Sequence, residues 1–302
     1  MKKIILGIIV FWAAVAPGAA LAEVVGALMP SRNVPYFMLV HDAFVKELKA
    51  LGSDAEVILQ KPSANELSWR NATRKLMVLE AKVIVAYGSD TALAISTENK
   101  TIPVVYTGAY DPEGMGVNAE TVTGMSATVP LKGLIGNLKK ISDFKTLGIL
   151  YSGTEMGSVR QMESAVTLAE GMGAKILRIN TAEADFSNLP DTDAILLTSA
   201  AEINQKSNLA KIIDKARAKK MATASVLCGT CENGVLISLS ANPEHQGQGA
   251  AKMVAAILKG TKPSDIPADK TPKVEMTINL KEAKDLGLSI PFELLGTSKV
   301  VK

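Results

Sequence analysis

Two short apolar runs with one helix between them, in residues 82–117, most constrain how this chain can fold. The segment reads KVIVAYGSDTALAISTENKTIPVVYTGAYDPEGMGV, with apolar runs at 83–87 and 102–106 and a predicted helix at 91–98. Each run ends in a tyrosine, followed by a polar turn that contains glycine. Such runs are typical of parallel strands that helices cover on both faces. Small-molecule sites in these sheets lie beyond the carboxyl ends of the strands, so we expect one half of a binding cleft here.

Strands and helices alternate along nearly the whole chain. The helix predicted at 63–80 begins with Ser63 and Glu66, which have the spacing of a capping box. After an extended segment at 121–127 the alternation restarts, and only a short acidic connection at 181–190 stands where a helix would be usual. This order predicts an α/β protein with two Rossmann-like lobes, each built on a parallel sheet between helices.

Three extended segments are predicted to join the lobes: residues 121–127 and the chain near Leu239 and near Lys273. Three connections permit closure by bending and resist twisting, which suits a cleft that closes over a ligand. The predicted lobes are residues 23–123 plus 241–270 for the first and residues 124–240 plus 271–302 for the second.

The first 22 residues have the order of a secretory signal peptide. Lys2 and Lys3 precede an apolar run at 4–15, and Ala20-Leu21-Ala22 forms a cleavage site, so the mature chain is predicted to begin at Glu23. An uncleaved membrane anchor is the alternative, but the apolar run is shorter than the ~20 residues that a spanning helix needs. We expect a protein of the periplasm.

The charge balance argues against a polyanionic partner. Removal of the two lysines of the leader changes the 33 Lys and Arg residues to 31, against 30 Asp and Glu residues. A chain so close to neutrality offers no broad basic surface for nucleic acid or anionic lipid. We expect a monomer whose direct ligand is a small molecule.

Polar and aromatic residues at the predicted strand ends are the first site candidates. Ser89, Asp90 and Thr91 open a helix whose free amides attract an anion or a dipole, although plain helix capping explains the same residues. Tyr106 and Tyr151 end strands, as Tyr87 does, and a tyrosine there either orients a ligand or packs in the core.

Cys228 and Cys231 are the only cysteines, and they are three residues apart. In an exported protein such a pair is expected to form a local disulfide. A redox pair and a metal site are the alternatives. The redox reading needs a thiolate at a helix N-terminus, and the metal reading needs two further ligands that His41 and His245 are not spaced to supply.

Enzyme signatures are missing from the sequence. It contains no G-x-G-x-x-G, no G-x-S-x-G, no H-E-x-x-H and no P-loop lysine after Gly153-Thr154. The sequence has two histidines, and neither is spaced from a serine or cysteine as the base of a nucleophile would be, which argues against nucleophilic catalysis. We therefore expect a protein that is not an enzyme and uses no cofactor or metal.

Several stretches resemble a known family. They are TIPVVYTGAYDPEGMGV, VTGMS, LGILYSGTEMGS and the long run from GVLISLSANPEHQGQG to INLKEAKDLGLSIP. Together they resemble the ABC-transport substrate-binding proteins of the group that includes tryptophan- and tyrosine-type binding proteins, and the resemblance covers nearly all of the mature chain. It implies a type I-like periplasmic binding protein fold.

The resemblance also implies a set of ligand-binding positions. Gly157 stands where relatives commonly have asparagine, and Ser199 stands where many have aspartate. The missing acid matters because a desolvated ammonium group needs a carboxylate partner, which Asp90 or Asp111 would have to supply. The expected ligand-binding residues are Ser31, Tyr36, Ser89, Asp90, Thr91, Tyr106, Asp111, Tyr151, Ser199, Ser225 and Asn242.

By this resemblance the protein traps a small molecule between two lobes and delivers it to an inner-membrane ABC permease. The ligand is expected to be amino-acid-like, aromatic or apolar. Two alternative functions are considered. One is a periplasmic carrier of a lipid-like molecule such as a sterol or hopanoid on the same fold, and the other is a thiol-redox protein that uses the cysteine pair.

Overall fold

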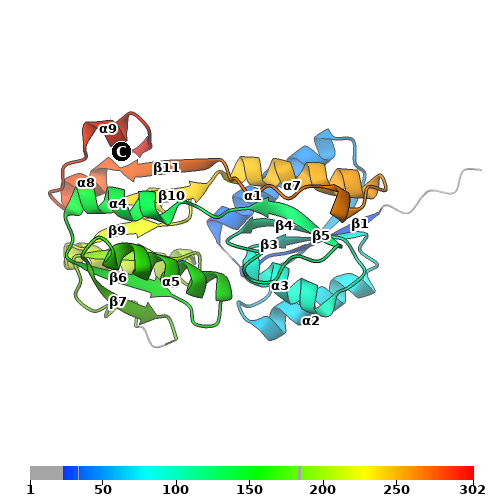
Figure 1. Cartoon of the computed structure of the whole chain (residues 1–302), viewed down its shortest axis with the longest axis horizontal. Helices are drawn as coiled ribbons and strands as arrows, with labels where there is room; N and C mark the ends of the chain where they lie inside the picture. The colour runs from blue at the N-terminus through cyan, green and yellow to red at the C-terminus, as the bar shows by residue number, and fades with distance from the viewer. Residues whose placement is uncertain (1–22, 33, 183–184) are drawn as a thin grey trace, which may run out of the picture.

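Two lobes lie side by side, each with a sheet between helices (Figure 1). The structure is a computed structural model, and it describes residues 23–32, 34–182 and 185–302. The predicted signal peptide falls outside these residues. None of the described helices is both long enough and apolar enough to cross a bilayer.

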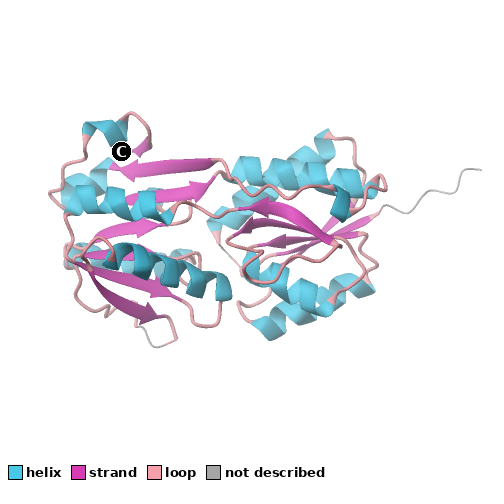
Figure 2. Ribbon diagram, viewed as in Figure 1, coloured by secondary structure: helices cyan, strands magenta, loops and turns pink. Residues whose placement is uncertain are grey.

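The first lobe holds a five-stranded sheet in which every neighbouring pair is parallel. Its central strands are almost entirely buried because helices cover both faces, as Figure 2 shows. In spatial order the strands are β2 (Glu56–Gln60), β1 (Val24–Leu28), β3 (Val83–Tyr87), β4 (Val104–Ala109) and β5 (Val122–Ser126).

Helices α2 (Glu66–Val78) and α3 (Ser89–Glu98) cover one face of this sheet, and α1 (Pro35–Ala50) and α7 (Pro243–Leu258) cover the other (Figure 1). The α1 and α7 backbones approach closely at Gly247, where a Cβ atom would lie 2.3 Å from the carbonyl oxygen of a facing α1 residue. The lobe therefore includes a late helix from the C-terminal part of the chain.

The second lobe holds a seven-stranded sheet in which every neighbouring pair is parallel except one. β11 runs antiparallel to β10, which differs from the expected all-parallel sheet. In spatial order its strands are β12 (Lys299–Val301), β11 (Val274–Asn279), β10 (Ile237–Ala241), β9 (Ala222–Ser225), β8 (Ala194–Leu197), β6 (Thr146–Tyr151) and β7 (Lys175–Asn180). Its helices are α4 (Leu131–Ser142), α5 (Met156–Glu170), α6 (Lys206–Ala218), α8 (Leu280–Asp285) and α9 (Phe292–Leu295).

The chain passes between the lobes three times. It crosses at residues 127–130 after β5, at Asn242 between β10 and α7, and before β11, where the Asn242 amide donates to the carbonyl of Lys273 at 2.7 Å. The amide of Ser126 donates to the carbonyl of Asp269 at 2.8 Å, which ties the first crossing to the third. These hydrogen bonds make the crossings one bundle, as a hinge requires. The residue boundaries of the lobes stay a prediction.

Two helices begin elsewhere than expected. Helix α2 starts after Asn65, whose side chain accepts from the amide of Ser68 at 2.9 Å, so Asn65 and not Ser63 is the cap. Helix α3 starts at Ser89, two residues early, because Gly88 has φ +89° and turns the chain into the helix at once. Between β7 and β8, the described residues form only turns, as the acidic connection predicts.

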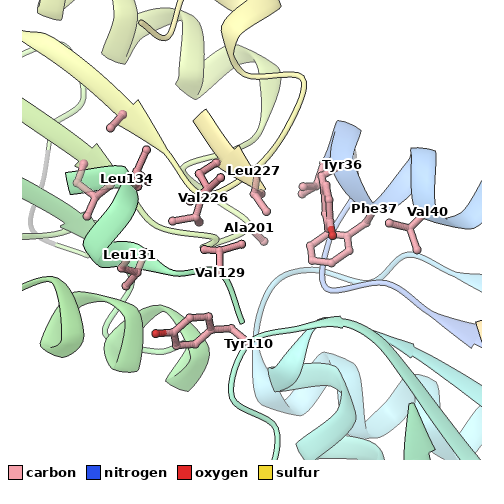
Figure 3. Packing of buried hydrophobic residues seen from close by; sticks show 14 of the residues in the cluster. Tyr36, Phe37, Val40, Tyr110, Val129, Leu131, Leu134, Ala201, Val226 and Leu227 are labelled. Carbon is pink, nitrogen blue, oxygen red and sulfur yellow. The ribbon is translucent and has the colours of Figure 1, made fainter. Parts of the chain in front are cut away.

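One apolar cluster extends across both lobes. Figure 3 shows Tyr36, Phe37 and Tyr110 of the first lobe facing Val129 and other apolar residues of the second. These side chains are buried, with exposed fractions of 8% or less. The lobes are therefore in direct contact, and the structure is a closed one.

Candidate functional site

A small cavity lies between the lobes, beyond the carboxyl ends of strands of both sheets. Its volume is about 20 Å³, which is room for roughly one water molecule. This part of the boundary between the lobes is thus almost filled by the protein's own side chains. The lining residues are Pro30, Phe37, Gly88, Ser89, Asp90, Gly108, Tyr110, Glu155, Gly157 and Ser199.

The first-lobe wall is built by the turn between β3 and α3. Gly88 starts the helix without a side chain, and the next two side chains are then carried toward the second lobe. The Ser89 hydroxyl donates to the carbonyl of Tyr110 at 2.6 Å, which ties the turn to the loop after β4. The wall is therefore held by a buried hydrogen bond within its own lobe.

Asp90 reaches across the cleft to the N-terminus of α5. Its carboxylate accepts from the amide of Met156 at 2.5 Å and from the amide of Gly157 at 3.4 Å. Free amides and the helix dipole make this end of α5 attractive to an anion. Burial raises the pKa of Asp90 to about 6, against the opposing effect of these amides. A first-lobe carboxyl group thus fills the anion site of a second-lobe helix.

Glu155 places a second carboxyl group at the same cavity. It is 4% exposed, and both of its oxygens lie 3.0 Å from the amide nitrogen of Ala201. Burial raises its pKa to about 8, and the negative charges of Asp90 and Glu202 add to that increase. The cavity therefore contains two neighbouring acids, each of which titrates above its ordinary range.

The second-lobe wall is held by hydrogen bonds within that lobe. The Ser158 hydroxyl accepts from the amide of Ser152 at 3.0 Å and shares a hydrogen bond with the Thr198 hydroxyl at 2.7 Å. The Gln161 side chain accepts from the amide of Ser199 at 2.7 Å. These side chains fix the backbone of the wall, so they are not free to contact a ligand.

Two further contacts join the lobes beside the cavity. Arg160 of α5 forms an ion pair with Asp111, with 2.6 Å between Nε and Oδ2. The Gln205 side chain donates to the Ser31 hydroxyl at 3.3 Å. With the Asp90 contact, these interactions bridge the lobes.

The predicted ligand-binding residues divide into three groups. Ser89, Asp90 and Ser199 line the cavity. Ser31 and Asp111 bridge the lobes next to it. The structure places the remaining six outside the lining: Tyr36, Thr91, Tyr106, Tyr151, Ser225 and Asn242.

Most of those six have local structural roles. The Thr91 hydroxyl donates to the carbonyl of Tyr87 at 2.7 Å, and the Ser225 hydroxyl accepts from the amide of Leu227 at 3.2 Å. Asn242 caps α7, where its side chain accepts from a backbone amide at 2.9 Å. Tyr106 packs in an apolar cluster of the first lobe.

The other two tyrosines belong to the cluster that spans the lobes. Tyr151 is partly buried against it. Tyr36 is 1% exposed, and burial raises the pKa of its phenol, whose oxygen has no hydrogen-bond partner among the described residues. Neither lines the cavity. Whether any of the predicted residues binds a ligand remains a prediction.

The sequence reading missed several lining residues, of which Glu155 matters most. It stands in the turn between a strand and α5, and a carboxyl group at that position was the available signal. Phe37 and Tyr110 lie in a helix and a loop, where nothing in the sequence separates them from core residues. Gly88, Gly108 and Gly157 contribute backbone to the cavity.

The predicted disulfide is absent, since Cys228 and Cys231 are both free thiols in the structure. The Cys231 thiol is turned into the second sheet, where it lies 3.4 Å from both the Ser238 hydroxyl and the Thr277 carbonyl. Burial raises the pKa of Cys228 to about 11 and that of Cys231 to about 12. The spacing of the pair suggested a bond, but the fold gives the inner thiol other partners.

No group of three or more His, Cys, Asp or Glu side chains is placed to hold a metal ion in the part of the chain that the structure describes. The cavity offers instead two carboxyl groups, two aromatic rings and exposed backbone of three glycines. Such a surface is suited to hydrogen bonding and charge pairing with a small molecule.

Solved structures share this fold. A conserved domain protein from Vibrio cholerae is 24% identical with a TM-score of 0.84, over 94% of this chain and 100% of its own. An ABC domain from Streptococcus pneumonia in complex with L-Trp is 22% identical with a TM-score of 0.83, over 93% and 100%. A ligand-free, open substrate-binding protein from Clostridium difficile is 21% identical with a TM-score of 0.65, over 93% and 99%.

These structures confirm the expected fold class of two Rossmann-like lobes. A comparison with curated proteins found no match. The family model described as ABC transporter substrate binding protein matches residues 37–302, nearly the whole described chain. The chain therefore belongs to the ABC transporter substrate-binding protein family, as the sequence resemblance implied.

Proposed function

We propose that this protein is a periplasmic solute receptor that closes two lobes over one small molecule and delivers it to an inner-membrane ABC permease. The observation that carries the proposal is the cavity at the meeting point of the two sheets, lined by residues of both lobes. A ligand favours the closed state only as far as it contacts both lobes, and this position allows contact with both.

A solute larger than one water molecule enters only when the lobes separate. The three crossings, tied together by backbone hydrogen bonds, are where such bending would occur. Opening breaks the contacts of Asp90 with α5 and of Asp111 with Arg160. When the lobes close again, the bound solute contacts both of them.

The cavity chemistry disfavours the two alternatives. A carrier of a sterol or hopanoid needs an apolar cleft, whereas two carboxyl groups face this one. A thiol-redox protein needs a thiolate near neutral pH, whereas burial raises the pKa of both thiols to about 11 or 12. Neither alternative has an observation in its favour.

The cellular setting is part of the proposal. The leader sequence predicts export with cleavage after Ala22, and the near-neutral charge of the mature chain fits a protein that binds small solutes. We propose a monomer, because the ligand site is complete within one chain.

The test combines thermal shift with small-angle scattering against a solute library. The proposal expects at least one solute to raise the melting temperature by several degrees while the radius of gyration stays at, or falls to, that of the closed form. Native mass spectrometry of protein purified from its own periplasm should show the same solute bound. A library in which no solute stabilises the protein would overturn the proposal.

A further inference from the structure

Resting on the proposed receptor function, we infer that the solute is a small organic cation, a protonated amine with an apolar body and no carboxylate of its own. The inference follows from which charges the cleft already contains. Three features of the cavity carry it: an occupied anion site, two acids without a cationic partner, and aromatic walls.

The anion-attracting place that the second lobe offers to the cavity is already occupied. The N-terminus of α5 presents the amides of Met156 and Gly157 to the cleft, and the carboxylate of Asp90 accepts from both. A ligand carboxylate would have to displace Asp90 and leave it without these partners. An unpaired buried carboxylate is strongly unfavourable unless it takes up a proton, so such a ligand is disfavoured.

Gly157 makes this occupation possible. A Cβ atom there would lie 3.2 Å from Oδ2 of Asp90 and 3.4 Å from Cβ of Ser89. Both distances are at or below ordinary contact, so a side chain at this position would push the Asp90 carboxylate away from the helix end. The absence of a side chain at Gly157 therefore leaves the space that the Asp90 carboxylate occupies.

The acids of the cavity lack a counter-ion. Neither Asp90 nor Glu155 takes part in an ion pair among the described residues, and Arg160 on α5 is paired with Asp111. Burial raises the pKa of Glu155, and repulsion by the negative charge of Asp90 raises it further. A cation placed beside them would relieve this repulsion, and a further anion would increase it.

The walls of the cavity suit the body of such a ligand. Phe37 and Tyr110 both line it, and Figure 3 shows Tyr110 extending from the first lobe toward the second. Aromatic faces attract organic cations, and the attraction is largest when the cation is desolvated. Carboxyl groups beside aromatic rings are therefore a surface for an amine with an apolar body.

The experiment compares amines with the amino acids from which they differ only by a carboxylate. The pairs are phenethylamine with L-phenylalanine, tyramine with L-tyrosine, tryptamine with L-tryptophan and isoamylamine with L-leucine. Affinities are measured by isothermal titration calorimetry on the purified protein. We expect at least one amine to bind, and each amine that binds to do so at least tenfold more tightly than its amino acid.

Variants test the role assigned to Asp90. Asp90→Asn removes the charge that occupies the end of α5, so the amine preference should fall by at least tenfold. Asp111→Asn breaks a bridge outside the cavity and should weaken both members of a pair equally, leaving the ratio unchanged. Glu163→Gln removes an exposed carboxylate of the same helix and should change neither affinity.

An amino acid that binds as tightly as its amine would overturn the inference, and so would the failure of every amine while another solute binds. In both cases the receptor function would stand. A library without any binding solute would remove the receptor function itself, so the two failures are distinguishable. An amine preference that survives Asp90→Asn would refute the assigned role of Asp90.

Discussion

The two lobes use the same topological position in opposite ways. In the first lobe the turn after β3 sends the carboxylate of Asp90 outward, across the cleft. In the second lobe the polar side chains near the start of α5 do not cross the cleft. Ser158 and Glu155 accept hydrogen bonds from backbone amides of their own lobe. Where these two turns meet, the first lobe thus contributes a side chain to the contact, and the second contributes backbone amides.

This difference explains which substitutions should affect folding and which should affect closure. Side chains that bind their own lobe stabilise the fold, because their loss leaves buried amides without partners. Side chains that reach across stabilise only the closed arrangement, since water replaces their partners when the cleft opens. The predictions below test this division, from the largest expected effect to the smallest.

The largest effect is expected from the pH response of Glu155. Its pKa rises from an ordinary 4.5 to about 8 in the folded protein, mainly through burial. Because the pKa is raised, the stability linked to the protonated group is complete below pH 4.5 and is lost as the pH rises through 8. Between pH 5 and 9 the free energy of unfolding should fall by on the order of 3 kcal/mol relative to Glu155→Gln.

Chemical denaturation of both proteins across that range checks this prediction. Glu163→Gln, on the exposed side of the same helix, is the matched control and should follow the wild type. If stability changed with pH in the same way for wild type and Glu155→Gln, the raised pKa of Glu155 would be contradicted.

Ser158→Ala should destabilise the fold by about 2 kcal/mol, because the buried amide of Ser152 loses its acceptor. Ser89→Ala removes a single donated hydrogen bond to the Tyr110 carbonyl and should cost about 1 kcal/mol. Urea denaturation of the two variants compares the turns directly. A larger loss for Ser89→Ala would contradict the expectation that a buried amide without an acceptor costs more than a carbonyl that loses one donor.

Gly157→Asn should open the cleft without unfolding either lobe. The new side chain would crowd Asp90, and we expect the open form to gain about tenfold, equivalent to about 1.4 kcal/mol. Small-angle scattering of the ligand-free variant should show a larger radius of gyration. Gly133→Asn in α4 is the control, because a Cβ there meets no atom within 4 Å. An unchanged radius for Gly157→Asn would show that closure does not depend on this contact.

Asp111→Asn should have the smallest effect, about 0.5 kcal/mol on closure, because its ion pair with Arg160 is partly exposed. The effect should shrink as salt is raised, since exposed ion pairs are screened. Scattering at low and high ionic strength measures it. Asp285→Asn, which breaks an ion pair with Lys281 on α8, should leave closure unchanged at both salt concentrations.

The sequence was sufficient for the fold class and for part of the cleft wall. Continuous apolar strands separated by helices have few ways to pack, so two sheets with helices on both faces followed from the pattern. Ser89 and Asp90 could be found because they follow a buried strand directly. The position of a residue after a strand is a local property, and local properties are readable in one sequence.

The differences between expectation and structure concern side-chain direction. Thr91 follows Asp90 in the helix, but its hydroxyl donates to the carbonyl of Tyr87 at the end of β3 and does not point into the cavity. Tyr106 ends a strand as expected, but packs in a first-lobe cluster away from the cavity. Cys228 and Cys231 have a bonding spacing, but the inner thiol is directed into the second sheet. Spacing alone does not determine these directions, because neighbouring elements decide them.

The sequence by itself determined two sandwiched sheets, three crossings and a polar turn at the end of β3. Only the tertiary structure decided that the carboxylate of that turn faces the start of a helix from the other lobe, with Glu155 beside it. The physical reason is that charge interactions depend on distance through space and on burial. Asp90 and Met156 lie 66 residues apart in the chain, and only the closed fold brings them within hydrogen-bond distance.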